Sequence, residues 1–204
     1  MNYFEIKKKE AKDFLDGEGE DKSTKGSVDK QILPLLKVIN DIPYFYTTSS
    51  CAGRINLISS NSKKRESKWL FMSHDEISLH KTKEITDYLN LDYESIWFKM
   101  ESPILHVCAS SVNRADEFIS LAKFCGLKRS GIMSASKRIM IESFSTENVE
   151  VPLRYNNKVL IKSDLSNYVE SLIKISNERL KRSRKKLDAF STKLKEKYDI
   201  NDEL

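Results

Sequence analysis

Short runs of strand-forming residues, several of them joined by very short connections, constrain the fold of this chain most. The runs at 95–101 and 104–110 flank the dipeptide Ser102-Pro103, and those at 129–135 and 138–145 lie equally close together. Consecutive strands with such short connections pair antiparallel, because a parallel pair needs a crossover of a dozen or more residues. The sequence therefore predicts an α+β fold whose sheet is mixed or largely antiparallel.

Apolar residues at helical spacing predict the helices that pack on this sheet. Pro34 should either kink the second helix or mark a late start, and Gly126 should end the fourth. The apolar face of the last helix is continuous only as far as Leu180, so we expect the second half of that helix to project or to lie loosely across the surface. Helices are predicted over 2–16, 27–40, 78–90, 112–125 and 164–198, with Ser27 and Ser163 or Asp164 as caps, and further strands or extended segments over 43–48, 54–59, 68–73, 149–154 and 158–162.

A doubly wound, Rossmann-type fold is poorly supported by the glycine pattern. Such folds carry a GxGxxG loop that follows a first strand and enters a helix. Here Gly17 and Gly19 lie in an acidic loop that follows no strand. We therefore expect any nucleotide-like ligand to bind in a pocket of another architecture.

The length of 204 residues suits a single domain, 1–204, in which 164–198 is a long C-terminal helix. Charged residues make up 32% of the chain, which is typical of a protein with a highly charged surface. No apolar run is long enough to span a membrane and the first residues lack a signal-peptide pattern, so we expect a cytoplasmic protein without membrane contact. The three cysteines have no metal-ligand spacing, and no metal is expected.

Positive charge is concentrated near the C-terminus. Residues 174–197 hold ten Lys or Arg and three Asp or Glu, a local balance of +7 against +5 for the whole chain. Such a stripe can follow a phosphate backbone by releasing counterions, although it can also be an ordinary solvated helix face. The cations expected to contact RNA are Arg182, Arg184, Lys185 and Lys186.

A bend of small residues after the strand 43–48 is the strongest candidate for a site. Ser49, Ser50 and Cys51 place short side chains beside exposed backbone N–H groups, Gly53 permits a sharp turn, and Arg54 offers a fork of donors for a carboxylate or phosphate. The plain alternative is a tight turn between two strands. The sequence does not decide whether Arg54 would hold a small ligand or a phosphate.

Other polar residues at predicted strand ends are secondary candidates. His74 and Asp75 can act as general base or orient a substrate, or can simply cap a turn. His106 lies within a strand and can be structural or can line the pocket. Ser130 and Gly131 can place backbone N–H groups against a ligand or form a plain bulge, and Lys128 and Arg129 beside them can extend an RNA surface. The strand aromatics Tyr44, Tyr46 and Trp69 can stack on a base or be core.

Several of these segments together resemble the wybutosine-synthesizing methyltransferase family, which modifies phenylalanine tRNA. The main signature is Thr48-Ser-Ser-Cys-Ala-Gly-Arg54, in which Ala52 stands where serine is often expected. The resemblance covers most of the chain, from about Ser27 to the final helix. The other matching pieces, in order, are Asn40, Trp69-Leu-Phe-Met-Ser-His-Asp75, Ile104-Leu-His-Val107, Ser130-Gly-Ile132 and Val151-Pro-Leu153.

The resemblance implies an enzyme that uses S-adenosylmethionine to methylate N4 of a 4-demethylwyosine derivative beside the anticodon of tRNA-Phe. It implies His74 and Asp75 as catalytic residues. The residues implied for cofactor binding are Ser49, Ser50, Cys51, Gly53, Arg54, His106, Ser130 and Gly131.

Two other functions remain compatible with the same residues. One is a non-catalytic RNA-binding module that uses the basic stripe. The other is a small enzyme that binds a nucleotide or phosphate in the bend 49–54. Saturable binding of S-adenosylmethionine distinguishes the methyltransferase from both.

Overall fold

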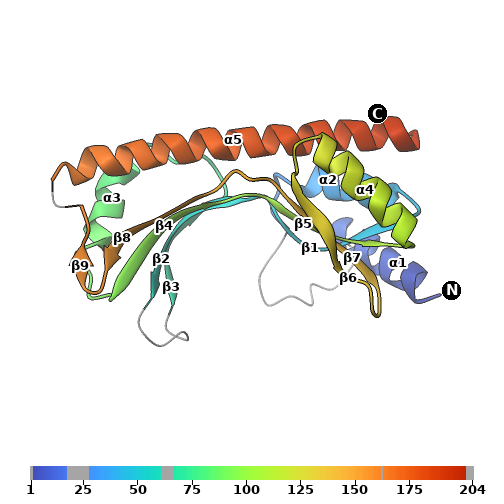
Figure 1. Ribbon diagram of the computed structural model, residues 1–204, viewed down its shortest axis with the longest axis horizontal. Helices are drawn as coiled ribbons and strands as arrows, with labels where there is room; N and C mark the ends of the chain where they lie inside the picture. Colours follow the sequence, from blue (N-terminus) through green and yellow to red (C-terminus); the bar gives the residue numbers. More distant parts are fainter. Residues whose placement is uncertain (1, 18–27, 61–66, 162, 201–204) are drawn as a thin grey trace. The chain divides into compact units, whose positions relative to one another are not determined.

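The computed structural model describes residues 2–17, 28–60, 67–161 and 163–200 (Figure 1). The chain divides into two compact units. Unit 1 comprises Met1–Ala52, Pro103–Thr146 and Ser183–Leu204, and unit 2 comprises Gly53–Ser102 and Glu147–Arg182. The predicted cap Ser27 and most of the acidic glycine-containing loop lie outside the described residues. The prediction of a single domain stays a prediction beside this division into units.

Unit 1 is built on a four-stranded sheet in the order β1-β5-β7-β6, in which every neighbouring pair is antiparallel. Its helices α2 and α4 lie on one side of the sheet, and α1 lies on the other (Figure 1). The elements are α1 (Tyr3–Leu15), α2 (Leu33–Asp41), β1 (Phe45–Cys51), β5 (Ile104–Ala109), α4 (Val112–Phe124), β6 (Arg129–Ser134) and β7 (Ile139–Phe144).

The alternation of side chains along β5 explains why helices cover both faces of this sheet. Leu105 and Val107 point into the main core with α2 and α4, whereas Cys108 packs with Tyr46 and Met140 on the opposite face. Phe4 of α1 meets Tyr46 there, with ring centroids 5.1 Å apart. Both faces of the sheet are therefore apolar over part of their length.

Unit 2 is built on a five-stranded antiparallel sheet in the order β3-β2-β4-β8-β9. Helix α3 and the first half of α5 pack on one face of this sheet through a single apolar cluster. The elements are β2 (Arg54–Ser60), β3 (Lys68–Ser73), α3 (Lys81–Tyr88), β4 (Ser95–Glu101), β8 (Val149–Tyr155) and β9 (Lys158–Val159).

Helix α5 runs from Leu165 to Tyr198, close to the predicted bounds. The expectation that its second half lies loosely is wrong. Phe190 and Leu194 are fully buried in the core of unit 1, and Leu187 is nearly so. The sparser apolar stripe is sufficient because one large aromatic ring fills the space that several smaller residues would otherwise occupy.

The α+β class and the antiparallel pairing are confirmed, but the predicted hairpin across Ser102-Pro103 is wrong. Strand β4 pairs with β2 and β8, whereas β5 pairs with β1 and β7, so the two strands belong to different sheets. The division between the units falls at Ser102 and Pro103. Proline suits this point because it lacks the N–H that a continuing ladder would need.

Two local signals are borne out by the backbone. Pro34 stands in the first turn of α2, so it marks a late start of the helix and not a kink. Gly126 follows α4 with φ 97°, a conformation that side chains disfavour. None of the helices in the described part of the chain combines the length and apolar character that a membrane crossing requires.

Candidate active site

The structure gathers the predicted site residues of unit 1 around His106. The Nδ1 atom of His106 lies 2.8 Å from the backbone oxygen of Ser49 and 2.9 Å from its Oγ. The Nε2 atom lies 3.1 Å from Oε1 of Glu142. The ring is thus held between a carbonyl and a carboxylate, which fixes its orientation and suits it to hold or pass a proton.

The strand register explains how these groups meet. His106 of β5 pairs with Glu142 of β7, which pairs in turn with Gly131 of β6. Paired residues point to the same face of a sheet, so the three positions form a row across it. Ser50 of β1 pairs with Leu105 and lies outside this row, but its Oγ accepts the backbone N–H of His106 at 3.4 Å. Ser49 and Ser50 therefore contact His106, and Gly131 lies two strands away in the same row; that they form one cofactor site stays a prediction.

A groove of about 310 Å³ runs along the edge strand β6 beside this row. Gly131 opens it, because a Cβ atom built there would meet nothing within 4 Å. The guanidinium of Arg129 lies 5.9 Å from the ring centroid of Phe144. The groove is lined by Lys128, Arg129, Ser130, Gly131, Ile132, Met133, Glu142 and Phe144. It therefore unites predicted cofactor residues with two predicted RNA-binding cations.

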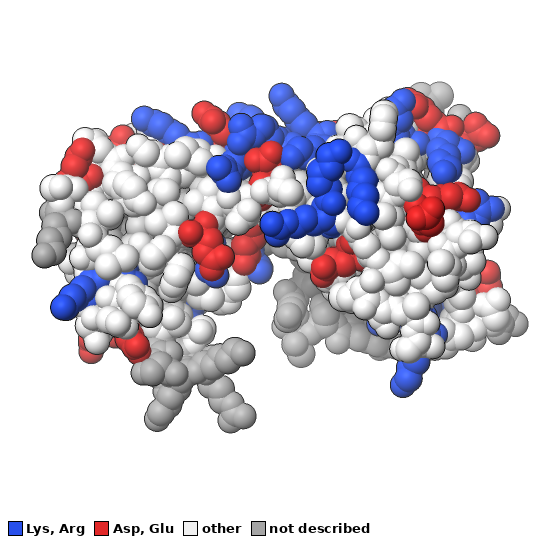
Figure 2. All heavy atoms as spheres, viewed as in Figure 1, with Lys and Arg blue, Asp and Glu red and all other residues white. Residues whose placement is uncertain are grey.

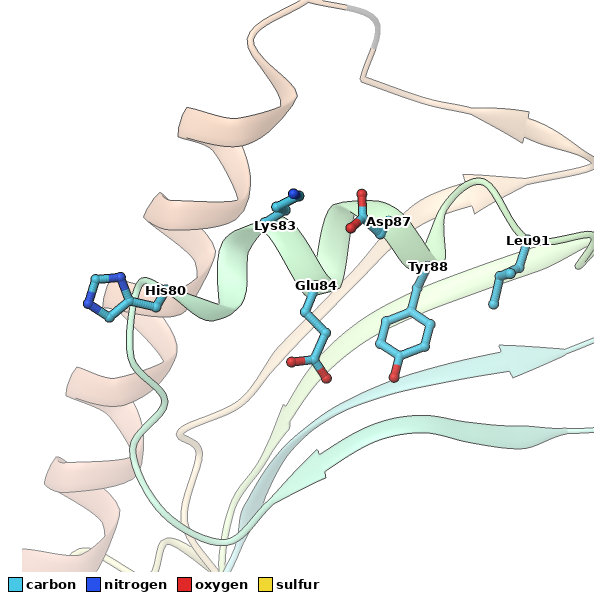
Figure 3. Close-up of a pocket in the computed structure, with 6 residues that line it drawn as sticks. All are labelled: His80, Lys83, Glu84, Asp87, Tyr88 and Leu91. Atoms are coloured by element: carbon cyan, nitrogen blue, oxygen red, sulfur yellow. The ribbon is translucent and has the colours of Figure 1, made fainter.

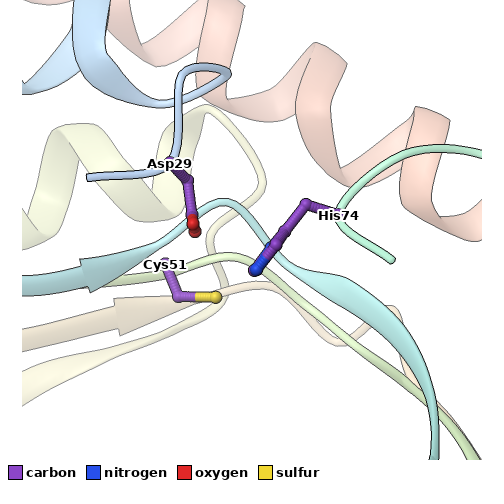
Figure 4. A group of neighbouring side chains, drawn as sticks. All are labelled: Asp29, Cys51 and His74. Atoms are coloured by element: carbon purple, nitrogen blue, oxygen red, sulfur yellow. The ribbon is translucent and has the colours of Figure 1, made fainter. Parts of the chain in front are cut away.

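A hydrogen bond within unit 1 fixes the end of the small-residue bend. The backbone N–H of Ala52 donates to Oδ2 of Asp29 at 2.8 Å, and Ala52 is buried. Cys51, drawn with Asp29 in Figure 4, ends β1 and is half-buried. The N–H of Ala52 is therefore used internally and is not available to a ligand.

In unit 2, the structure places Gly53 and Arg54 beside His74 at the same end of the β2–β3 pair. The Nδ1 atom of His74, also drawn in Figure 4, lies 2.9 Å from the carbonyl oxygen of Gly53. A carbonyl only accepts, so Nδ1 carries the proton and Nε2 of the neutral ring holds the lone pair. The backbone N–H of Asp75 bonds to Oγ of Ser73 at 3.1 Å, which fixes the turn that carries its exposed carboxylate.

Arg54 is engaged by neighbours on its own sheet. Its Nε donates to Oε2 of Glu101 at 2.5 Å, and its guanidinium carbon lies 4.3 Å from the centroid of the Trp69 ring. Nδ2 of Asn56 donates to the same carboxylate oxygen at 3.2 Å. The positive charge of Arg54 is therefore largely balanced within unit 2, which weakens its suitability as a simple phosphate clamp.

The predicted aromatic residues differ in their surroundings. Tyr46 is buried, and burial raises the pKa of its hydroxyl well above the ordinary value. Tyr44 lies under the guanidinium of Arg114, 3.7 Å from ring centroid to guanidinium carbon. Trp69 is 47% exposed. Of the three, Trp69 is the most exposed, although the Arg54 guanidinium lies against its ring.

Lys and Arg side chains gather along α5 (Figure 2). Arg182 belongs to unit 2 and forms an ion pair with Glu147 at 3.3 Å. Arg184, Lys185 and Lys186 belong to unit 1, where Lys185 is exposed and the other two are partly buried. The aliphatic part of Lys186 covers Gly126, with its Cδ 3.1 Å from where a Cβ would stand.

A second hollow, of about 480 Å³, lies on helix α3 of unit 2 (Figure 3). It contains none of the predicted site residues, and His80, treated as a surface residue from its sequence context, is exposed at its rim. The hollow is lined by His80, Lys83, Glu84, Asp87, Tyr88 and Leu91. Its mixed charges do not point to a defined ligand.

Comparison with known proteins decides the family. The family described as Methyltransferase TYW3 matches residues 6–196. The chain belongs to this family. The sequence is 37% identical over 174 residues to the Pyrococcus horikoshii protein named "tRNA(Phe) 7-((3-amino-3-carboxypropyl)-4-demethylwyosine(37)-N(4))-methyltransferase 1", covering 83% of this chain and 86% of the relative. It is 33% identical to an Arabidopsis thaliana protein named "tRNA wybutosine-synthesizing protein 2/3/4", over 85% of this chain and 19% of that much longer protein.

Solved structures agree with this family assignment. The PH1069 protein of Pyrococcus horikoshii superposes with a TM-score of 0.77 at 35% identity, covering 94% of this chain and 95% of its own. A hypothetical protein from Aeropyrum pernix superposes with a TM-score of 0.69 at 28% identity, over 82% of this chain and 98% of its own. The chain is thus a methyltransferase-family member without a Rossmann fold.

Sequence reasoning missed the acidic and amide partners of the site. Glu142 faces His106, and Glu101 faces Arg54 and Asn56. No local motif marks these residues, because each reaches its partner from another strand and only the register brings them together. Their position on the polar face of an alternating strand was the single available signal.

Proposed function

We propose that this chain transfers a methyl group from S-adenosylmethionine to N4 of a 4-demethylwyosine derivative in tRNA-Phe, in the cytoplasm. The family match over residues 6–196 carries this conclusion. The activity named for the Pyrococcus horikoshii relative supports the choice of substrate, because the alignment covers most of both chains. The site residues then have to bind a cofactor, bind RNA and remove one proton from the nucleoside.

The chemistry of the unit 1 groove fits part of the cofactor. Glu142 can pair with the ammonium group of the cofactor, while Gly131 leaves room above the strand. The volume of about 310 Å³ is at the lower end of the range for small-molecule sites. S-adenosylmethionine, when bound, supplies an electrophilic methyl group on a sulfonium that is a good leaving group. Most of the acceleration then comes from alignment of the two reactants.

Removal of the ring proton of the nucleoside is assigned to His74 or Asp75. The hydrogen bond from Nδ1 to the Gly53 carbonyl favours the tautomer in which Nε2 accepts, as a general base must. Asp75 stands on a fixed turn next to it and can orient the substrate or take the proton itself. His106, held between Ser49 and Glu142, orients groups in unit 1.

The basic cations of α5 support binding of the tRNA backbone. The helix is fixed by its buried face, so the cations project from a rigid support. Rigid placement lowers the entropy lost when phosphates are neutralised. The residues assigned to RNA contact are Lys128, Arg129, Arg182, Arg184, Lys185 and Lys186.

The decisive experiment is mass spectrometry of tRNA-Phe that carries the unmethylated precursor, incubated with this protein and isotopically labelled S-adenosylmethionine. The expected product is a labelled nucleoside heavier by one methylene unit. Saturable tRNA binding without any label in the nucleoside would contradict the proposed reaction and leave a non-catalytic RNA-binding role.

A substitution that fills the groove tests the cofactor site. Gly131→Leu projects a side chain into open space and should abolish saturable binding of S-adenosylmethionine in calorimetry, with an unchanged circular dichroism spectrum. Ser134→Leu, on the exposed end of the same strand and outside the groove, is the matched control and should bind normally. Equal binding by both variants would place the cofactor elsewhere.

A further inference from the structure

The outer face of the unit 2 sheet differs from every other sheet face of the described chain. Helices α3 and α5 pack against the face that carries Leu57, Phe98 and Met100. Side chains alternate along a strand, so the intervening residues of β2 and β4 point away from those helices. No described helix of unit 2 covers this second face.

Both tryptophans of the chain stand on that face in one cross-strand row. Ile58 of β2 pairs with Trp69 of β3 and with Trp97 of β4, and Trp97 pairs with Pro152 of β8. Trp69 is 47% exposed, which leaves much of a large apolar ring in contact with water. Aromatic rings on the open face of a sheet are a common means of holding unstacked nucleobases, since every base offers a flat face to stack.

Polar groups frame the exposed ring. The Arg54 guanidinium lies against Trp69 and is anchored by Glu101, which also accepts from Asn56. Asn56 is only 1% exposed, and its Oδ1 has no hydrogen-bond partner among the described residues. Asn56 therefore supports Glu101 from beneath the surface, whereas the Glu101 side chain is 40% exposed and can accept from a base seated beside Arg54.

We propose that this surface, the tryptophan face (Arg54, Asn56, Ile58, Trp69, Trp97 and Glu101), stacks an unpaired purine of the RNA substrate on Trp69. Arg54 extends the stacking surface as a cation, and the carboxylate of Glu101 accepts from the edge of the base. The inference rests on the proposed function for its ligand, an RNA with unpaired loop bases. It adds a nucleobase site to the phosphate contacts of α5.

A peptide partner is less suited to the same surface. Protein interfaces also use tryptophan and arginine, but their centres are depleted of charge. Here charged pairs lie beside both tryptophans: Arg54 with Glu101 at Trp69, and Lys99 with Glu150 at 2.6 Å, with Lys99 next to Trp97. Flat aromatic area with donors and acceptors at its edge matches a base more closely than an apolar side chain.

Tryptophan fluorescence tests the proposal directly, because Trp69 and Trp97 are the only fluorophores of this type. In a Trp97→Phe variant, addition of a stem-loop RNA with unpaired loop purines should quench the Trp69 emission in a saturable manner. A fully paired RNA of similar length should bind through phosphates without this quenching. Equal quenching by both RNAs, or binding of the stem-loop without quenching, would overturn the proposal.

Measurements of RNA affinity provide a second test of the nucleobase site. Trp69→Ala should weaken binding of the stem-loop by roughly 5- to 150-fold, the range expected when one base–aromatic stack is lost. Trp69→Phe should restore most of the affinity, whereas Phe124→Ala, an exposed aromatic of unit 1, should bind like the parent. Unchanged affinity in Trp69→Ala would also overturn the proposal.

These experiments distinguish failure of the proposed nucleobase site from failure of the proposed methyl transfer. Methyl transfer by the parent protein together with an unquenched Trp69 removes the nucleobase site and leaves the enzyme activity. Quenching by the stem-loop with no methyl transfer retains the site and removes the proposed reaction.

Discussion

The buried end of α5 makes a quantitative prediction about stability. Phe190 is fully buried in unit 1, and its ring meets that of Phe118 edge-on with centroids 5.0 Å apart. Phe118 in turn meets Phe45 with centroids 5.1 Å apart. Phe190→Ala therefore removes the last of three rings that pack edge-to-face and leaves a cavity beside Phe118.

The expected cost is about 4 kcal/mol, within the range measured for Phe→Ala in protein cores. With a urea m-value of about 2 kcal/mol/M, the midpoint of unfolding should fall by about 2 M while m stays unchanged. Circular dichroism in the helical band follows the transition. Both tryptophans lie in unit 2, so their fluorescence reports that unit alone and shows whether it unfolds in the same transition.

Phe124→Ala is the matched control, since this ring is 76% exposed at the end of α4. Its stability should stay within about 0.5 kcal/mol of the parent. If Phe190→Ala shifted the midpoint no more than Phe124→Ala, the second half of α5 would not be packed in the core, and the reasoning about its rigidity would be refuted.

Two further predictions test local features. Gly126→Ala should destabilise by about 1–2 kcal/mol in urea unfolding, because φ is 97°, whereas Gly131→Ala, without such strain and facing open space, should be nearly neutral. Burial, with Lys12 nearby, lowers the pKa of Lys8 from 10.5 to about 8. Between pH 8 and 10.5 the unfolded chain holds a proton that the folded chain has released, so the free energy of unfolding should rise with pH in the parent. Lys8→Met should lack that component of the rise, and identical pH profiles would refute the assigned shift.

Much of the fold could be predicted from local signals in the sequence. Strand β3 begins at Lys68 and ends at Ser73, as expected, and α4 ends where Gly126 requires it. These signals act over a few residues, so periodicity and turn chemistry are sufficient to find them. Which strands pair could not be predicted in this way. Strands β4 and β5 are separated by two residues yet join different sheets, because each pairs with strands that are distant in the sequence.

The candidate site residues could be proposed from the sequence, and their role stays a prediction, whereas the side chains that contact them could not be foreseen. The bend signature, His74 and His106 stood out by type and position, and the structure gives each histidine a defined hydrogen bond. Nothing in the sequence singled out the acids Glu142 and Glu101, because a carboxylate on a strand is most often solvated. Their roles depend on register, which single-sequence periodicity does not determine.

The order of segments in unit 1 has a consequence for synthesis of the chain. Its core needs Phe45 from the first segment, Phe118 from the middle one and Leu194 from the last, whereas unit 2 is complete once Arg182 has been made. A nascent chain emerging from the ribosome therefore has to keep the early strands of unit 1 from aggregating until the segment that carries Leu194 has been made. Premature termination shortly before Leu194 should yield a product that chaperones retain and proteases remove, even though all of unit 2 has been made.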